Sequence, residues 1–184
     1  MGDFSQNGII SNLHDFGTKT TADIEKELVK FSKERKMELI LPSLYSELKG
    51  DALPNIVKQI SETKYLNHII IGLDKASKTE AVKAWKFFKK LNTPFTILWN
   101  DGPRLKKLHE ELKEKDLAPS EMGKGRNVWY CLGMCIARDE ARSVALHDCD
   151  IKTYDRRMLA KLFYPVVNPF FNFEFCKGYY PRIS

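Results

Sequence analysis

Apolar residues recur every three to four positions in several stretches of the chain, and short apolar runs separate these stretches. In residues 21–34, for example, Ile24, Leu28 and Phe31 fall on one face of a helix. Further helices are expected at residues 51–62, 77–91, 103–114, 126–141 and 155–163. Strands are expected at residues 38–42, 66–74, 95–99, 143–148 and 171–180. Helix and strand therefore alternate along most of the chain.

This alternation predicts an α/β fold, a three-layer sandwich in which helices cover both faces of a mostly parallel sheet. Parallel strands need crossover connections, and these are usually helices. The sequence has 184 residues, of which 43% are hydrophobic, so it suits one domain at residues 21–184 after a polar lead at residues 1–20. Ligands of such sheets bind beyond the carboxyl ends of the strands, and we look for a site at that edge.

The helical periodicity also predicts which large side chains are buried. Val82, Trp85 and Phe88 recur at helical spacing and are expected to face inward. Trp99 and Trp129 also lie in apolar stretches, so all three tryptophans are expected to pack in the core and not to stack on a nucleobase.

Polar residues follow the first two predicted strands. The segment PSLYSE, residues 42–47, could form a loop whose backbone and Glu47 hold a nucleobase and a ribose. Asp74 and Ser77 come after the second strand, where they could hydrogen-bond another part of the same nucleotide. The alternative is that all of these are ordinary turn residues.

Two aspartates one residue apart follow the fourth predicted strand. In extended chain Asp148 and Asp150 point to the same side, and their like charges repel unless a cation, such as a divalent metal ion, lies between them. The alternative is a turn, with Asp155 capping the helix that follows. His147 faces away from the aspartates, so we expect a packed or hydrogen-bonded histidine and no metal ligand, whereas His109 is expected in solvent on its helix.

A short glycine-rich segment opens the predicted helix at residues 126–141. Gly123 and Gly125 flank Lys124, and free backbone N–H groups and a cation at a helix start can together bind a phosphate. A flexible turn into the helix remains the alternative. The spacing fits neither a Walker loop nor a dinucleotide-binding fingerprint.

Charge narrows the choice of partners. The formal net charge is +6 and the isoelectric point is near 9.0. Lys and Arg nevertheless alternate with Glu in stretches such as residues 104–116, which indicates a solvated helix face and argues against a nucleic-acid partner. A mildly positive protein also suits small anionic substrates such as nucleotides.

The cysteines and the hydropathy pattern bear on location. The four cysteines form no C-x-x-C pair, so we expect buried free thiols and neither zinc nor a disulfide; they are Cys131, Cys135, Cys149 and Cys176. No apolar run reaches the roughly 18 residues that a membrane span needs, and no basic-then-apolar leader opens the sequence. We expect a reduced, cytoplasmic protein with no membrane partner.

Four segments in this order resemble the nucleotide-sugar-binding half of glycosyltransferases with the GT-A fold. They are LPSLYSE, IIIGLDKAS, GKGRNVWYCLGMCIA and VALHDCD. Together with YDRRMLAKLFYPVVNPFFNFEFCKGYYPRIS, they are similar to the bacterial glucosyl-3-phosphoglycerate synthase family over residues 38–184. The resemblance implies a retaining transferase that moves glucose from a nucleoside-diphosphate glucose, expected to be UDP-glucose, to 3-phosphoglycerate.

The resemblance also implies roles for residues. The family's nucleotide loop falls on Pro42, Ser43, Leu44 and Glu47, and its uracil and ribose contacts continue at Ser77 and Lys124. The polar positions after the strands and at the helix start add Asp74, Gly123 and Gly125. The family's Asp-x-Asp motif falls on Asp148, Cys149 and Asp150. Asp150 would ligate Mg²⁺ or Mn²⁺ at the donor phosphates, and Asp148 would lie nearer the sugar as the candidate catalytic residue and a second metal ligand.

The family's acceptor-binding loop and a histidine metal ligand are expected beyond residue 184. The chain is therefore expected to resemble the amino-terminal, donor-binding portion of a longer enzyme. Two other functions stay open, a non-catalytic nucleotide-sugar-binding module and a metal-dependent phosphohydrolase. The donor sugar, the base and the oligomeric state also stay open, with a homodimer as one such state.

Overall fold

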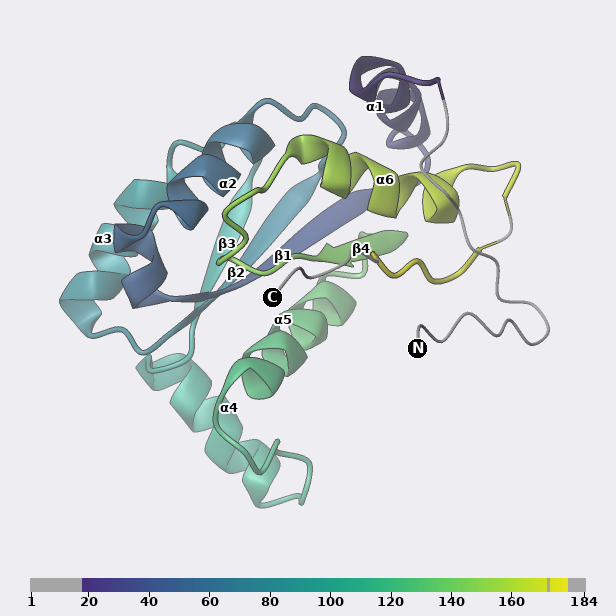
Figure 1. The fold of residues 1–184 in the computed structure, drawn as a ribbon. Coiled ribbons are helices and arrows are strands. Elements are labelled where there is room, and N and C mark those ends of the chain that lie inside the picture. Colours follow the sequence, from purple (N-terminus) through teal and green to yellow (C-terminus); the bar gives the residue numbers. More distant parts are fainter. Residues whose placement is uncertain (1–17, 172, 179–184) are drawn as a thin grey trace, which may run out of the picture.

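A four-stranded parallel sheet forms the centre of the computed structural model, which describes residues 18–171 and 173–178 (Figure 1). The strands are β1 (Met37–Leu44), β2 (His68–Asp74), β3 (Phe95–Trp99) and β4 (Ser143–Leu146). Their order in the sheet is β3-β2-β1-β4, and every pairing is parallel. The predicted parallel α/β sandwich is confirmed.

Helices cover both faces of this sheet. They are α1 (Thr21–Phe31), α2 (Ala52–Ser61), α3 (Lys78–Phe88), α4 (Pro103–Lys113), α5 (Lys124–Arg138) and α6 (Arg156–Val167), with the 3₁₀ helix η1 (Tyr45–Lys49) after β1. Figure 1 shows α2, α3 and α6 over one face, with α1 beside α6, and α5 with α4 on the other. Every crossover between neighbouring strands thus carries a helix, as parallel pairing requires.

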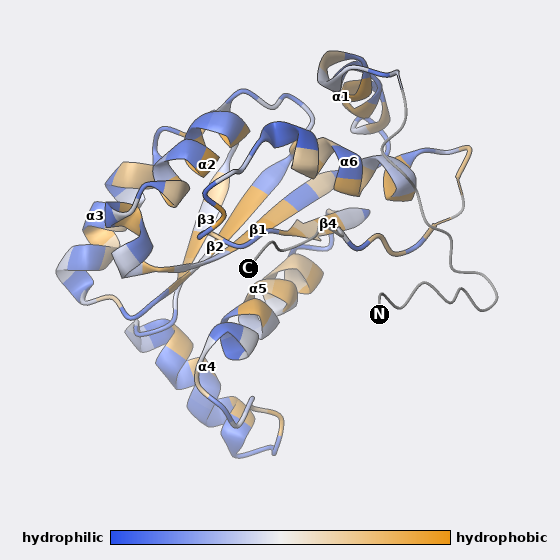
Figure 2. Cartoon of the chain, in the orientation of Figure 1, coloured by the Kyte–Doolittle hydropathy of each residue, from blue (hydrophilic) through white to orange (hydrophobic). Residues whose placement is uncertain are grey.

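The two faces of the sheet have separate hydrophobic contacts. Leu39 and Ile71 pack on the side of α2, α3 and α6, whereas Ile40 and Ile70 pack against Cys131 of α5. Figure 2 shows apolar residues concentrated on the central strands. Within the described residues no helix is long and apolar enough to cross a membrane. The thiols of Cys131, Cys135, Cys149 and Cys176 are free, as predicted, and the first three are buried.

Helix α5 lies unusually close to β2 because β2 carries a glycine at the contact. A Cβ atom on Gly72 would stand 1.7 Å from Oδ1 of Asn127 and 2.7 Å from Sγ of Cys131. The Asn127 Nδ2 group donates a 2.8 Å hydrogen bond to the Gly72 carbonyl. This contact fixes where the amino-terminal end of α5 stands relative to the ends of β1 and β2.

The helix starts follow local capping rules. Thr20 and Ser77 each form a capping box with the acid three residues later. Asp155 caps α6 by accepting a hydrogen bond from the Arg157 backbone N–H, as predicted, and Pro103 takes the first position of α4. Of the predicted polar lead, residues 1–17 lie outside the described residues.

Three predictions about the fold are wrong. Val82 and Trp85 are 52% and 46% exposed, because α3 packs on the sheet through Ala84 and Phe88; Phe88 is buried, as predicted. Trp129 is also exposed, on the outer face of α5, whereas Trp99 packs against the core as expected.

The strand predicted at residues 171–180 is the third. Its described residues, 171 and 173–178, form no strand, and residues 172, 179 and 180 lie outside the described part. The alternation of Phe171, Phe173 and Phe175 suggested a strand, but Phe175 is largely exposed and Phe171 and Phe173 pack ring against ring.

Candidate functional site

Most of the predicted site residues gather where β1, β2 and β4 end. In the sheet register Pro42 pairs with Gly72, Ser43 with Leu73 and Leu44 with Asp74, so the first two polar segments leave the sheet side by side. β4 pairs with β1 as far as Ile40 and Leu146, and the next backbone N–H, of His147, donates to the Ile40 carbonyl. The carboxyl edge of the sheet therefore brings together segments from three parts of the sequence.

An ion pair joins the start of α5 to the end of β4. Nζ of Lys124 lies 2.5 Å from Oδ1 of Asp148, and both side chains are about half exposed. Gly123, the residue before the helix, has φ of +139°, which a residue with a side chain rarely adopts, and no side chain caps α5. A Cβ on Gly125 would meet nothing within 4 Å. The first turn of α5 thus presents a cation and uncapped N–H groups in one place.

The two aspartates of the Asp-x-Asp segment leave the buried layer together. The strand ends at Leu146, earlier than predicted, yet the alternation of burial continues: His147 and Cys149 are buried, whereas Asp148 is partly exposed and Asp150 is exposed. Burial raises the pKa of the Cys149 thiol, with a further increase from the charge of Glu47. The Cys149 side chain therefore points inward as a neutral thiol, and the flanking carboxylates face outward.

Glu47 lies close enough to Asp150 and Lys124 to feel both charges. Its Oε2 accepts a 2.9 Å hydrogen bond from the Leu44 backbone N–H, which ties the carboxylate to η1. Burial raises the pKa of Glu47, and the Asp150 charge adds to this increase while Lys124 opposes it. Glu47 thus faces Asp150 and Lys124 across the site.

Two exposed carboxylates next to a lysine fit a magnesium or manganese ion that a diphosphate helps to hold. Such ions are commonly bound by one or two carboxylates together with substrate phosphates and water. Among the described residues no group of three or more His, Cys, Asp or Glu side chains could hold a metal ion. Asp148 and Asp150 therefore suit an ion whose remaining ligands come with a nucleotide.

His147 lies behind the aspartates and does not face them. It is 4% exposed, and its ring centroid lies 5.3 Å from that of Tyr154 at an edge-on angle. Neither ring nitrogen has a hydrogen-bond partner within the described part of the chain. Burial lowers the pKa of His147 to about 4, so the ring is neutral at pH 7. The prediction of a packed histidine is confirmed.

Asp74 and Ser77 already have partners in the protein. Oδ1 of buried Asp74 lies 3.6 Å from the Arg126 guanidinium of α5, and the Ser77 hydroxyl is engaged with Glu80 in the capping box. Ser77 would have to exchange a partner in order to bind a nucleotide directly.

Sequence reasoning missed the residues around the end of β3. Arg126 of α5 faces Asp74, and the Asp101 carboxylate accepts a 2.9 Å hydrogen bond from the Ala76 backbone N–H. Asn100 is buried at the same edge. Asn100 and Asp101 directly follow a predicted strand, so the rule applied to the other strands would have found them.

His109 is tied to the same region. Its Nδ1 lies 2.6 Å from the Tyr130 hydroxyl, so the expectation of a solvated histidine is wrong. Tyr130 projects from α5 toward α4, and an apolar run gives no signal that one of its members will fix a polar side chain of a neighbouring helix.

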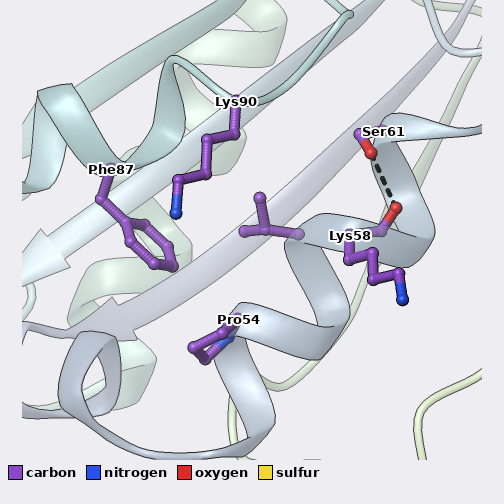
Figure 3. A pocket seen from close by; sticks show the side chains of 6 residues that line it. Pro54, Lys58, Ser61, Phe87 and Lys90 are labelled. Atoms are coloured by element: carbon purple, nitrogen blue, oxygen red, sulfur yellow. Dashed lines mark hydrogen bonds between the residues drawn. The ribbon is translucent and has the colours of Figure 1, made fainter.

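A cavity between α2 and α3 lies away from this edge. Figure 3 shows Pro54, Lys58 and Ser61 of α2 facing Phe87 of α3 and Lys90 just after it, around a cavity of about 260 Å³. Ser61 donates a hydrogen bond to the carbonyl of Lys58. These residues lie on α2 and at the carboxyl-terminal end of α3, and none of them is a predicted site residue.

Comparisons with known proteins agree with this geometry. No protein-family model matches the sequence. Glucosyl-3-phosphoglycerate synthase of Persephonella marina is 45% identical over 184 residues, which is 100% of this chain and 46% of that protein. The synthase of Methanococcoides burtonii is 37% identical over 176 residues, 95% of this chain and 43% of that protein. The chain spans about half the length of these relatives.

A solved structure shows the same fold. The crystal structure of Mycobacterium tuberculosis glucosyl-3-phosphoglycerate synthase in complex with Mn²⁺, UDP and glucosyl-3-phosphoglycerate superimposes with a TM-score of 0.53 at 16% identity, over 85% of this chain and 47% of that one. The resemblance seen in the sequence is confirmed, and the fold is the GT-A glycosyltransferase type. The chain is a homologue, over its whole length, of part of the glucosyl-3-phosphoglycerate synthases.

Proposed function

We propose that this chain binds a nucleoside-diphosphate glucose, UDP-glucose, and serves a synthase that transfers glucose with retention to 3-phosphoglycerate. One observation carries the proposal: the Lys124–Asp148 ion pair joins the uncapped start of α5 to the Asp-x-Asp segment. A cation, helix N–H groups and two carboxylates thereby meet at the edge where ligands of parallel sheets bind. The names of the relatives identify the reaction to test.

The diphosphate is assigned to the start of α5. A phosphate oxygen would replace Asp148 as the partner of Lys124, and the N–H groups that follow Gly123 and Gly125 would donate to the same phosphate. Asp150 and the released Asp148 would then hold Mg²⁺ or Mn²⁺, which supplies Lewis-acid stabilisation of the departing nucleoside diphosphate. Asp148, the candidate catalytic residue, stands on the sugar side of this arrangement.

The nucleoside is assigned to the ends of β1 and β2. Backbone groups of Pro42, Ser43 and Leu44 line this edge, and Glu47, Asp74 and Ser77 lie along it. The hydrogen bond from the Leu44 N–H holds the Glu47 carboxylate in place at this edge. We assign the acceptor site and a further metal ligand to the part of the relatives that this chain does not span.

Binding of UDP should require a divalent ion. With Mn²⁺ present, calorimetric titration should show one UDP per chain, and excess EDTA should weaken binding about tenfold or more, because two phosphates cannot approach Asp148 and Asp150 without a cation. Asp150→Ala should weaken Mn²⁺-supported binding to a similar extent. Glu111→Ala, which removes an exposed carboxylate on α4, should leave it unchanged.

Equal affinities with Mn²⁺ and with EDTA would contradict the metal role.

A second assay separates the remaining functions by following UDP release from UDP-glucose, with and without 3-phosphoglycerate, for this chain and for a version extended to the relatives' full length. A non-catalytic binding module would bind UDP, but neither this chain nor the extended version would release UDP from UDP-glucose. A phosphohydrolase releases phosphate from simple esters, whereas the proposed synthase needs the acceptor and the extended chain.

The proposal also includes the cellular compartment of the protein. We assign the protein to the cytoplasm, and the free state of its four cysteine thiols supports that assignment, since a reducing compartment keeps thiols unpaired.

A further inference from the structure

The exposed surface of α3 and its carboxyl-terminal cap carries apolar side chains among lysines. Val82, Trp85, Lys86 and Lys89 are spaced three or four residues apart and form one exposed stripe. Nζ of Lys89 lies 4.2 Å from the centroid of the Trp85 ring, a cation–π contact that holds the ammonium group beside the indole. An isopropyl group and an indole thus stand in solvent next to two cations.

The basic surface continues from this stripe onto α2. Lys90 lines the cavity between the two helices together with Phe87, and exposed Lys58 lines it from α2 (Figure 3). Nζ of Lys90 lies 5.3 Å from the centroid of the Phe87 ring. Exposed Lys83 precedes Lys90 by two helical turns and lies on the same side of α3. We call the whole set the basic face; it consists of Val82, Trp85, Lys58, Lys83, Lys86, Lys89 and Lys90.

The positive charge of the basic face is largely uncompensated. None of its five lysines forms an ion pair within the described residues. The one acid within residues 78–90 is Glu80, whose carboxylate accepts hydrogen bonds from the Ser77 hydroxyl and backbone N–H. Helix α4 shows the contrast, because its lysines alternate with glutamates and Lys107 pairs with Glu111 at 3.7 Å. The basic face therefore favours an anionic partner.

We propose that the basic face attaches this protein to the surface of an anionic lipid bilayer. The lysines lie at the lipid phosphates, and Trp85 with Val82 enters the boundary between headgroups and acyl chains. An indole is favoured at this depth because it is apolar with one polar N–H. A nucleic-acid backbone would pair with the lysines but offers nothing apolar to Val82, whereas the lipid interface accepts both kinds of side chain.

This attachment needs no membrane-spanning segment. The expectation of no membrane partner rested on the lack of a long apolar run and of a leader, and neither is required for a helix face that lies on a lipid surface. None of the residues of the basic face is a predicted site residue, so the proposal is independent of the proposed function. The carboxyl edge of the sheet stays free for the nucleotide while the basic face contacts lipid.

Sedimentation with vesicles tests the role of charge. The chain should sediment with vesicles of phosphatidylcholine and phosphatidylglycerol in equal parts, should not sediment with phosphatidylcholine alone, and should be released by salt. Lys86→Ala combined with Lys89→Ala should weaken binding about twentyfold, because each lysine near an anionic surface contributes about fivefold. Lys107→Ala combined with Lys113→Ala removes the same charge from exposed positions of α4 and should change binding by no more than about twofold.

Fluorescence tests the insertion of the indole. Lipids with brominated acyl chains quench tryptophans that reach the interface, so the emission of the unaltered chain should fall when it binds such vesicles. Trp85→Phe should abolish this quenching. Trp129→Phe should retain it, because exposed Trp129 lies on α5, which covers the other face of the sheet. Denaturant melts should give all of these variants the stability of the unaltered chain, since each altered side chain is exposed.

Each contrary result overturns the proposal. These results are equal sedimentation with both kinds of vesicle, full binding by the variant altered at Lys86 and Lys89, and quenching that persists in Trp85→Phe. Binding of a single-stranded DNA oligonucleotide without binding of vesicles would assign the lysines to nucleic acid instead. Titration of the same variants with UDP and Mn²⁺ separates the two proposals, because a failure to bind UDP leaves the lipid results standing, and a failure to bind vesicles leaves donor binding standing.

Discussion

At the scale of single residues, His147 shows how close a buried polar group stands to the proposed site without belonging to it. Its ring lies against Tyr154, and its two nitrogens have no hydrogen-bond partner in the described chain. A neutral imidazole tolerates this environment better than a charged one, because burial penalises the charge. The buried His147 ring should therefore affect the free energy of unfolding.

The pH dependence of unfolding should reveal this histidine. Burial lowers the pKa of His147 from 6.5 to about 4, so below pH 6.5 the unfolded chain binds a proton that the folded chain does not. The contribution of the neutral His147 ring to the free energy of unfolding is thus fully present above pH 6.5. It falls by about 3 kcal/mol as the pH drops to 4. In His147→Phe, denaturant melts at pH 7 and pH 4 should differ by that much less than in the unaltered chain.

Tyr154→Phe is the matched control for that experiment. It removes only the hydroxyl from the same ring contact, so the full pH dependence should persist. If His147→Phe also retains it, the ring is not buried and neutral as described.

Predictions for single residues were confirmed where buried and exposed side chains alternate along the chain. The inward direction of His147 and the outward direction of Asp148 and Asp150 follow from a period of two, which the chain keeps even after the strand ends. Sequence could not show that Ser77 is held by Glu80 or Asp74 by Arg126, because a local motif does not specify long-range partners.

At the scale of elements, the contact between β2 and α5 positions the site. Lys124 lies at the start of α5, and α5 can approach β2 only because residue 72 has no side chain. The Asn127 amide then fixes the helix against the Gly72 carbonyl at 2.8 Å. A change at this contact should alter both stability and the placement of Lys124 opposite Asp148.

Gly72→Ala tests the contact. The new Cβ would collide with Asn127 and Cys131, so we expect the free energy of unfolding to fall by about 3 kcal/mol, from overpacking and a weakened hydrogen bond. Adding Asn127→Ala should recover part of that loss. Gly133→Ala, on the same helix with nothing within 4 Å of the new Cβ, should instead raise stability by about 0.5–1 kcal/mol. Equal effects at the two glycines would contradict the close approach.

The elements themselves were largely predictable because capping residues and periodic apolar positions are local signals. Helix α5 nevertheless begins two residues before the predicted start, which brings Lys124 into its first turn. The face that a helix buries was less predictable. In α3 two apolar stripes overlap, and only packing against the sheet decides that Ala84 and Phe88, and not Val82 and Trp85, face inward.

At the scale of the whole molecule, the strand order determines which residues share the carboxyl edge of the sheet. The order β3-β2-β1-β4 places Asn100, Asp74, Leu44 and Asp148 along one edge, although these residues lie far apart in the sequence. Sequence periodicity predicts strands but not their neighbours, so the grouping of these residues along one edge came only from the structure. The Lys124–Asp148 ion pair lies at the β4 end of that edge, where we propose that the phosphates bind.

A crystal structure of this chain with UDP and Mn²⁺ tests the central claim most directly. The account predicts an anomalous manganese peak at coordination distance from an Asp150 carboxylate oxygen and a phosphate within hydrogen-bond distance of the Lys124 ammonium. UDP bound in the cavity between α2 and α3, or UDP at this edge with no manganese beside Asp150, would contradict it.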